Sequence, residues 1–150
     1  MPHDASADPA CVLFNEMPRT SGITVDESFI ARWDRIHQIR DDVKKALEAA
    51  RKEKVIGSSL DAKVCLFCEG ELYDFISSMK EELIPVFIIS QLEVEQGGKG
   101  EHTGEAVPGL SMTVSHAEVE KCARCWCYSN TVGTSAEHPA LCSRCASVME

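Results

Sequence analysis

The sequence predicts an α+β protein that combines a long N-terminal helix, a small β-α-β junction subdomain and a C-terminal four-cysteine zinc ribbon or knuckle module. This prediction depends on helical apolar spacing early in the chain, short strand-like runs around a second helix, and two Cys-x-x-Cys pairs near the end. We divide the chain into an extended lead-in (1–23), a long helix (24–57), the small α/β junction subdomain (58–118) and the zinc-binding module (119–150).

The first part of the chain changes from an irregular segment to a helix. Residues 1–23 contain three prolines and no sustained periodicity, so we expect an extended lead-in. Thr24 and Glu27 fit a capping box at the start of a helix that spans about 25–55, and Gly57 is placed to end it. Because little else in the chain is helical at that length, part of the surface against which this helix packs is expected to be missing. Its apolar stripe consists of Phe29, Ile30, Trp33, Ile36, Ile39, Val43, Ala46, Leu47 and Ala50.

Charge is distributed unevenly along the chain, whose net charge is −9. Residues 27–54 hold 8 Lys/Arg against 6 Asp/Glu, a net of +2, whereas residues 66–120 hold 11 acids against two lysines, a net of −9. The overall charge argues against a simple basic nucleic-acid binder. The basic residues of the long helix fit either a solvated face or a ridge that faces phosphates.

The middle of the chain alternates strand and helix patterns. Apolar or alternating runs predict strands at 62–68, 91–96 and 110–116, and an amphipathic helix at about 71–83 separates the first two. We expect Pro85 to break or kink that helix, and the first two strands to pair in parallel across it. The stretch 97–109 holds five glycines and a proline and predicts a flexible loop. No apolar run reaches the length of about 20 residues that spans a membrane, so we expect no membrane partner.

Two cysteine pairs near the C-terminus carry the strongest chemical signal. Cys122/Cys125 and Cys142/Cys145 are separated by 16 residues, a spacing typical of tetrahedral four-cysteine Zn²⁺ sites. Two disulfides would need an oxidising compartment, for which no signal peptide is evident, and a redox Cys-x-x-Cys motif normally occurs singly. One further alternative stays open, in which His138 replaces Cys145 as the fourth ligand.

The other cysteines are predicted to have no metal role. Cys65 and Cys68 lie on a predicted strand, where residues three apart point to opposite faces, so we expect two small core hydrophobes. Cys127 is expected to point away from the metal, and the pattern around Cys11 gives no assignment.

Short motifs along most of the chain resemble one known family. The segments 121–126 (Lys-Cys-Ala-Arg-Cys-Trp), 132–133, 138–139 and 141–145 resemble the C-terminal zinc module of bacterial-type isoleucyl-tRNA synthetases, and a related module occurs in formamidopyrimidine-type DNA glycosylases. The segments 33–40, 45–51 and 56–62 resemble the end of the synthetases' anticodon-binding helical region, and 87–90 fits the junction after it. The resemblance covers roughly residues 12–148, in the family's order.

The resemblance implies a role in aminoacylation. A chain of this kind would help to hold the anticodon arm of isoleucine tRNA, with one structural Zn²⁺ on Cys122, Cys125, Cys142 and Cys145. The tRNA contacts are expected to come from Lys121, Arg124, Trp126 and Arg144, although Trp126 also fits a hydrophobic lid on the zinc knuckle.

The resemblance further implies that ATP binds only to the parent enzyme's catalytic domain. His-x-Gly-His and Lys-Met-Ser-Lys-Ser motifs do not occur in this sequence, so we expect no catalytic residues and no amino-acid activation by this chain alone. Its partners would be isoleucine tRNA and the remaining synthetase domains, in a cytoplasmic monomer.

Two other functions remain as alternatives. A zinc-ribbon module that binds a basic protein would suit the acidic middle of the chain. A DNA glycosylase of the formamidopyrimidine type is the less favoured alternative, because it needs an N-terminal Pro-Glu pair and this chain opens with Met-Pro-His-Asp.

Overall fold

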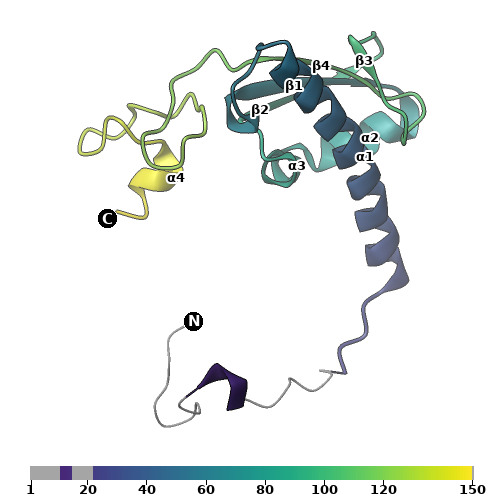
Figure 1. The fold of residues 1–150 in the computed structure, drawn as a ribbon, viewed down its shortest axis with the longest axis horizontal. Coiled ribbons are helices and arrows are strands. Elements are labelled where there is room, and N and C mark those ends of the chain that lie inside the picture. The colour runs from purple at the N-terminus through teal and green to yellow at the C-terminus, as the bar shows by residue number, and fades with distance from the viewer. Residues whose placement is uncertain (1–10, 15–21, 150) are drawn as a thin grey trace.

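The computed structural model describes residues 11–14 and 22–149 (Figure 1). The lead-in expected at 1–23 therefore lies largely outside the described residues. Its described part holds a short 3-10 helix, η1 (Val12–Phe14), and an irregular segment leads from residue 22 to the first α-helix.

The long helix α1 (Glu27–Lys52) is present, but the predicted capping residues are wrong at both ends. Asp26 caps the N-terminus in place of Thr24, because its backbone is extended and its carboxylate accepts the Ser28 N–H at 3.0 Å. At the C-terminus Lys54, and not the predicted Gly57, follows the last turn, in the left-handed conformation (φ 60°). The N–H groups of residues 54 and 55 then donate to the carbonyls of Arg51 and Ala50, which closes the last turn.

A four-stranded sheet with the order β2-β1-β4-β3 forms the centre of the fold. The central strand β1 (Ala62–Cys68) pairs in parallel with β2 (Gln91–Gln96), as predicted, and antiparallel with β4 (Ser111–His116). The two-residue strand β3 (His102–Thr103) pairs with β4 inside the stretch expected to be a flexible loop. A 3-10 turn, η2 (Ser59–Asp61), precedes β1, and the short helix α4 (Ser143–Ala146) lies near the C-terminus.

The crossover between β1 and β2 consists of two short helices, α2 (Gly70–Ser78) and α3 (Lys80–Phe87). The break between α2 and α3 lies at Met79, where φ is −129° and ψ is 23°. The helix was predicted to break or kink at Pro85 instead. Pro85 lies inside α3. A proline there removes one hydrogen bond to residue 81, in the first turn of a helix of only eight residues, so the loss does not end the helix.

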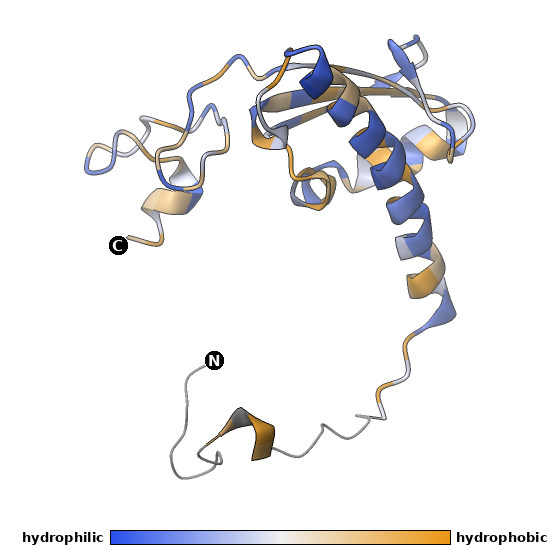
Figure 2. Ribbon diagram, viewed as in Figure 1, coloured by the Kyte–Doolittle hydropathy of each residue, from blue (hydrophilic) through white to orange (hydrophobic). Residues whose placement is uncertain are grey.

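One hydrophobic core joins the helices to one face of the sheet. Alternate residues of β1 are buried, and α1 contributes the second half of its apolar stripe. The first turns of α1 stay uncovered, with Phe29 53%, Ile30 48% and Trp33 36% exposed. Figure 2 shows an orange, hydrophobic turn in this lower part of α1. The side chains that are fully buried in this core are Ile36, Ile39, Val43, Val64, Leu66, Ile76, Leu83, Ile89, Leu110 and Met112.

A buried carboxylate on α1 orders the glycine-rich segment that was predicted to be a flexible loop. Asp42 is only 3% exposed, and its two oxygens accept the backbone N–H groups of Glu105, Ala106 and Val107 at 2.9–3.1 Å. A Cβ atom at Gly104 would lie 2.7 Å from Asp42 Oδ2, so only glycine permits this approach. Composition predicts mobility here, but the carboxylate fixes the segment by satisfying three consecutive backbone donors.

The two cysteines of β1 have different environments. They lie on opposite faces, as predicted, and Cys68 is buried in the core. Cys65 is only half-buried on the outer face, where its thiol donates to Glu95 Oε1 at 3.6 Å, so its assignment as a core residue is wrong. Among the residues that the structure describes, no helix is long and apolar enough to cross a membrane.

Candidate metal centre

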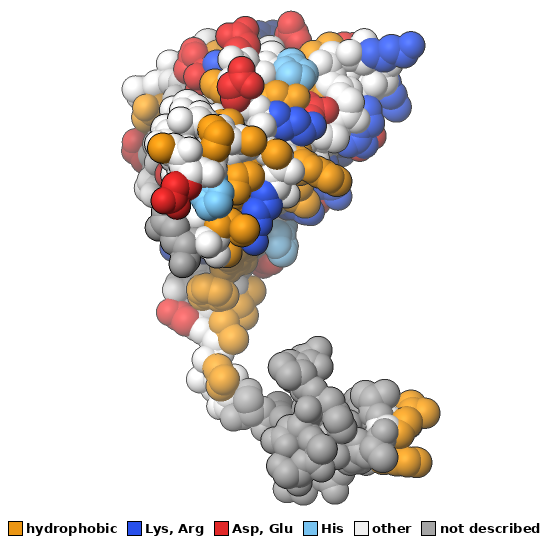
Figure 3. Space-filling view, turned by 90° about the vertical axis from the view of Figure 1, so that its left-hand side faces the viewer, with side chains coloured by type: hydrophobic (Ala, Val, Ile, Leu, Met, Phe, Trp, Pro, Cys, Tyr) orange, Lys and Arg blue, Asp and Glu red, His pale blue; other side chains and the backbone are white. Residues whose placement is uncertain are grey.

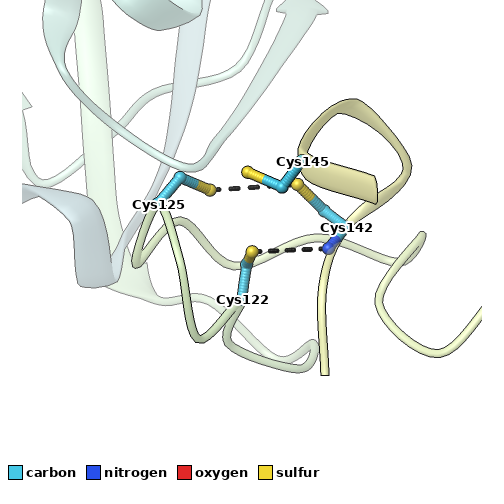
Figure 4. A group of neighbouring side chains, drawn as sticks. All are labelled: Cys122, Cys125, Cys142 and Cys145. Atoms are coloured by element: carbon cyan, nitrogen blue, oxygen red, sulfur yellow. Dashed lines mark hydrogen bonds between the residues drawn. The ribbon is translucent and has the colours of Figure 1, made fainter. Parts of the chain in front are cut away.

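The four predicted cysteines come from two tight turns that face each other beyond β4. In the first turn the Trp126 N–H donates to the Cys122 carbonyl at 2.9 Å, and a bridge between Lys121 and Tyr128 closes its base. The second turn starts α4, where the N–H groups of residues 145 and 146 donate to the Cys142 carbonyl. Each turn places two sulfurs on one side of the backbone, and Figure 4 shows the two pairs pointing toward each other.

The sulfur geometry fits a tetrahedral metal ion. All four Sγ atoms lie within 4.8 Å of one another, and the Sγ atoms of Cys125 and Cys142 are 3.8 Å apart. Zn–S bonds of about 2.3 Å in a tetrahedron place neighbouring sulfurs about 3.8 Å apart. Cys122, Cys142 and Cys145 are buried, and Cys125 is half-buried. The donor set and its spacing therefore fit Zn²⁺ with four protein ligands.

The surroundings of the sulfurs divide them into readily and poorly ionised thiols. Burial opposes ionisation of Cys122, but the N–H groups of Cys125, Cys142 and Arg124 outweigh it and lower the pKa of this thiol to about 6. The Cys142 N–H approaches the Cys122 sulfur at 3.3 Å (Figure 4). At Cys142, burial and the neighbouring sulfurs raise the thiol pKa to about 12. The N–H donors thus favour the thiolate form of Cys122, whereas burial and the neighbouring sulfurs favour the protonated form of Cys142.

Two candidate ligands lie outside this cluster. Among the described residues, His138 belongs to no group of ligand atoms that lie within 4.8 Å of one another. Its backbone N–H donates to Ser135 Oγ in the loop between the two cysteine turns. Cys127 also lies outside the cluster, and its thiol is directed to the Cys125 carbonyl at 3.8 Å. The geometry thus brings together the four cysteines rather than the histidine-containing set.

A second group of ligand-type side chains lies on the outer face of the sheet. It consists of Cys65, Glu93 and Glu95. Burial, followed by the charge of Glu95, raises the Cys65 thiol pKa to about 11, and Lys63 already pairs with Glu93 at 3.0 Å. A protonated thiol beside an occupied carboxylate is a poor metal site, and we assign no metal to it.

Two side chains just before strands anchor the module to the α/β subdomain: Ser90 precedes β2, and Asp61 precedes β1. Ser90 Oγ accepts the Tyr128 N–H at 2.7 Å, and the Tyr128 ring packs edge-on against His116. Lys121 pairs with Asp61 at 3.4 Å and lies over the Tyr128 ring. A cavity of about 260 Å³ separates the module from α3 at this junction. Sequence reasoning gave Ser90 and Asp61 no role of their own, although both lie in segments that resemble the synthetases, because their contacts join residues far apart in the chain.

The four side chains expected to contact tRNA fall into two pairs. Lys121 makes the anchoring contacts above, and the guanidinium of Arg144 lies beside Cys125, whose sulfur raises the Arg144 pKa. Arg124 and Trp126 are exposed, and among the described residues neither side chain has an ion-pair or ring partner. The Trp126 indole is 65% exposed, and its backbone is left-handed (φ 63°). Such exposure does not fit a lid on the zinc knuckle.

The fold and the cysteine cluster define a zinc-finger module joined to a small α/β subdomain. Residues 120–148 match the family described as "Zinc finger found in FPG and IleRS". Over most of its length the chain is also similar to proteins named isoleucine--tRNA ligase. It is 45% identical over 126 residues (83% of the chain) to that of Geobacter sulfurreducens, and 40% identical over 154 residues (100% of the chain) to that of Caldanaerobacter subterraneus.

These similarities confirm the resemblance read from the motifs. The chain is homologous to one segment of isoleucine–tRNA ligases, consistent with a C-terminal fragment of such an enzyme. It spans only 14% and 16% of the length of the two relatives above.

Proposed function

We propose that the chain is the zinc-stabilised, tRNA-binding segment of an isoleucine–tRNA ligase. Cys122, Cys125, Cys142 and Cys145 would bind one Zn²⁺, and the segment would hold the anticodon arm of isoleucine tRNA. The observation that carries this proposal is the cluster of four sulfurs, because it fixes the turn on which exposed Arg124 and Trp126 lie.

The metal's role would be structural. Four thiolates fill a tetrahedral Zn²⁺ site and leave no position open for water, so the bound ion supplies charge and cross-linking rather than Lewis-acid chemistry. Apart from the cysteines, the module buries few apolar side chains, and its cluster is separate from the main core. Folding of residues 119–149 should therefore be coupled to metal binding.

The exposed pair on the first turn would make the RNA contacts. An indole held away from the protein surface can stack on an unpaired base, and a guanidinium beside it can bind a phosphate or a base edge. In Figure 3, which faces the zinc-module side of the molecule, basic and hydrophobic side chains lie next to each other. Lys121 and Arg144 would instead position the module, because their partners are the α/β subdomain and a metal ligand.

Amino-acid activation is assigned to the rest of the enzyme. The sequence lacks the nucleotide-site motifs named above, and the relatives match this chain over only a fragment of their length. We propose that the chain works with the remaining domains of a monomeric cytoplasmic ligase, which would bind ATP and isoleucine.

Replacing Trp126 with Ala should weaken binding of the isoleucine-tRNA anticodon stem-loop by roughly tenfold, because one stacked base contributes about 1–3 kcal/mol. The measurement is a fluorescence anisotropy titration of zinc-loaded chain at fixed salt. Trp33→Ala is a matched control, since it removes an exposed indole from the distant first turns of α1. Equal affinity of wild type and Trp126→Ala would remove Trp126 from the proposed interface, and absence of any RNA binding by wild type would reject tRNA binding by this segment.

Zinc affinity should fall as pH falls, because all four thiols must be ionised to bind the metal. The Cys142 thiol, with its raised pKa, is protonated throughout the neutral range, so binding displaces its proton and affinity should change at least tenfold per pH unit. Below about pH 6 Cys122 also takes a proton, and the slope should steepen. Competition with a chelator at pH 5.5, 7 and 8 measures this slope. An affinity independent of pH would show that the ligands are not these thiols.

A further inference from the structure

An exposed isoleucine, Ile88, caps the C-terminus of α3 in the left-handed backbone conformation, which is energetically unfavourable for isoleucine. Ile88 has φ 58° and ψ 49°, and its side chain is 50% exposed. A β-branched side chain in the left-handed region is strained, whereas glycine would take the same cap without strain. Because a half-exposed side chain contributes little to the core, folding alone does not explain an isoleucine here.

A small pocket opens beside Ile88 on the seam between α1 and α3. It has a volume of about 130 Å³, and buried Leu47 and Phe87 lie at its base. Basic residues of α1 surround it, namely Arg40, Lys44 and Arg51. The pocket therefore combines an apolar floor with a cationic rim.

The rim keeps a net positive charge, and one of its cations is fixed on the seam. Arg40 Nε donates to the Val86 carbonyl at 2.9 Å, which fixes its guanidinium on the seam. The acid of the rim, Glu48, is 2.6 Å from Arg51, and Lys44 has no ion-pair partner within the described part of the chain. Three cations against one acid leave a net charge of +2 on the rim.

We propose that this pocket binds one unstacked nucleotide of the same RNA that contacts the zinc module. The base would pack on Ile88 and the apolar floor, and the flanking phosphate would lie between Arg40, Lys44 and Arg51. A base can pack on an apolar surface while adjacent cations bind its flanking phosphate, and proteins that bind single-stranded nucleic acid combine a packing surface with cations in this way. This inference rests on the proposed function, because the RNA is the ligand that it assigns to the chain.

The position of the pocket supports a shared ligand. Ile88 lies two residues before Ser90, whose hydroxyl accepts the Tyr128 N–H of the zinc module, and two residues of extended chain span at most about 7 Å. In Figure 1, α3 lies between α1 and the zinc module. The pocket therefore lies close to the contact that joins α3 to the zinc module, and for this reason we assign both sites to one RNA loop.

The test compares two glycine substitutions that relieve the same backbone strain. In the zinc-loaded chain, Ile88→Gly should leave the Tm unchanged or higher, yet weaken binding of the anticodon stem-loop about tenfold. Lys54→Gly is the matched control, because Lys54 has φ 60° and lies outside the pocket. It should keep affinity within about twofold. Lys44→Gln should weaken binding and reduce the slope of log affinity against log salt by about 1, whereas Lys52→Gln should not do so to the same extent.

A stem-loop series with single abasic nucleotides identifies the base concerned. At one loop position, removal of the base should weaken wild-type binding and abolish the effect of Ile88→Gly. If wild type binds RNA and Ile88→Gly binds equally well, the pocket proposal is wrong and the proposed function stands. Self-association of the chain that Ile88→Gly abolishes, with RNA affinity unchanged, would also overturn it in favour of a protein contact. If wild type binds no RNA, both proposals fail.

Discussion

Replacing Cys145 with Ser should remove the bound zinc and unfold the C-terminal module, while the α/β subdomain stays folded. Metal binding contributes about 10–16 kcal/mol to the folding of small zinc modules at neutral pH, and a hydroxyl cannot replace a thiolate ligand. The main core is a separate cluster of buried residues from α1, the sheet and the crossover helices, so it does not depend on the metal. Metal analysis should give one zinc per wild-type chain and none for the variant. Hydrogen exchange should show loss of protection confined to 119–149.

Two further variants decide which side chains bind the metal. His138→Ala and Cys127→Ser should both retain one zinc, because neither residue lies in the sulfur cluster. The histidine-containing set would give the opposite pattern, with zinc retained in Cys145→Ser and lost in His138→Ala. A wild-type chain that is purified under reducing conditions and takes up no zinc would contradict both sets.

Replacing Asp42 with Ala should destabilise the main core by about 3 kcal/mol. The substitution removes a buried carboxylate that holds three backbone N–H groups, and it leaves the N–H of buried Val107 without its partner. Urea unfolding should show this as a lower midpoint with an unchanged slope. Hydrogen exchange should quicken first at residues 105–107.

The neighbouring aspartate is a matched control for this prediction. Asp41 has the same charge and lies on the same helix, but its side chain is exposed, so Asp41→Ala should change stability by less than about 0.5 kcal/mol. Zinc content should be unchanged in both variants. Equal stability of Asp42→Ala and wild type would show that the hydrogen bonds to the segment 105–107 contribute no net stability.

Local patterns were sufficient for the long helix, the three longer strands and the two cysteine pairs. The spacing of Ile36, Ile39 and Val43 predicts a buried helix face, and the alternation in 91–96 predicts a strand. Both hold in the structure because periodicity reflects which face a residue presents. The Cys-x-x-Cys pairs predict convergent sulfurs for a similar reason, since a tight turn fixes the relation of two residues three apart.

The sequence by itself therefore determined the long helix, the three longer strands, which two strands pair in parallel, and the two cysteine pairs available to a metal. The break at Met79, the strand β3 and the exclusion of His138 from the cluster came only from the structure. Only the tertiary structure decided which charged side chains are free and which are engaged. Asp42 and Asp41 are adjacent acids in one charged stretch, yet only Asp42 meets the backbone of residues more than 60 positions away. Lys121 and Arg124 each directly precede one cysteine of the same pair, but only Lys121 meets Asp61. These differences depend on contacts between segments that are distant in the sequence. Periodicity and motif spacing describe only neighbours along the chain, so they do not predict such contacts.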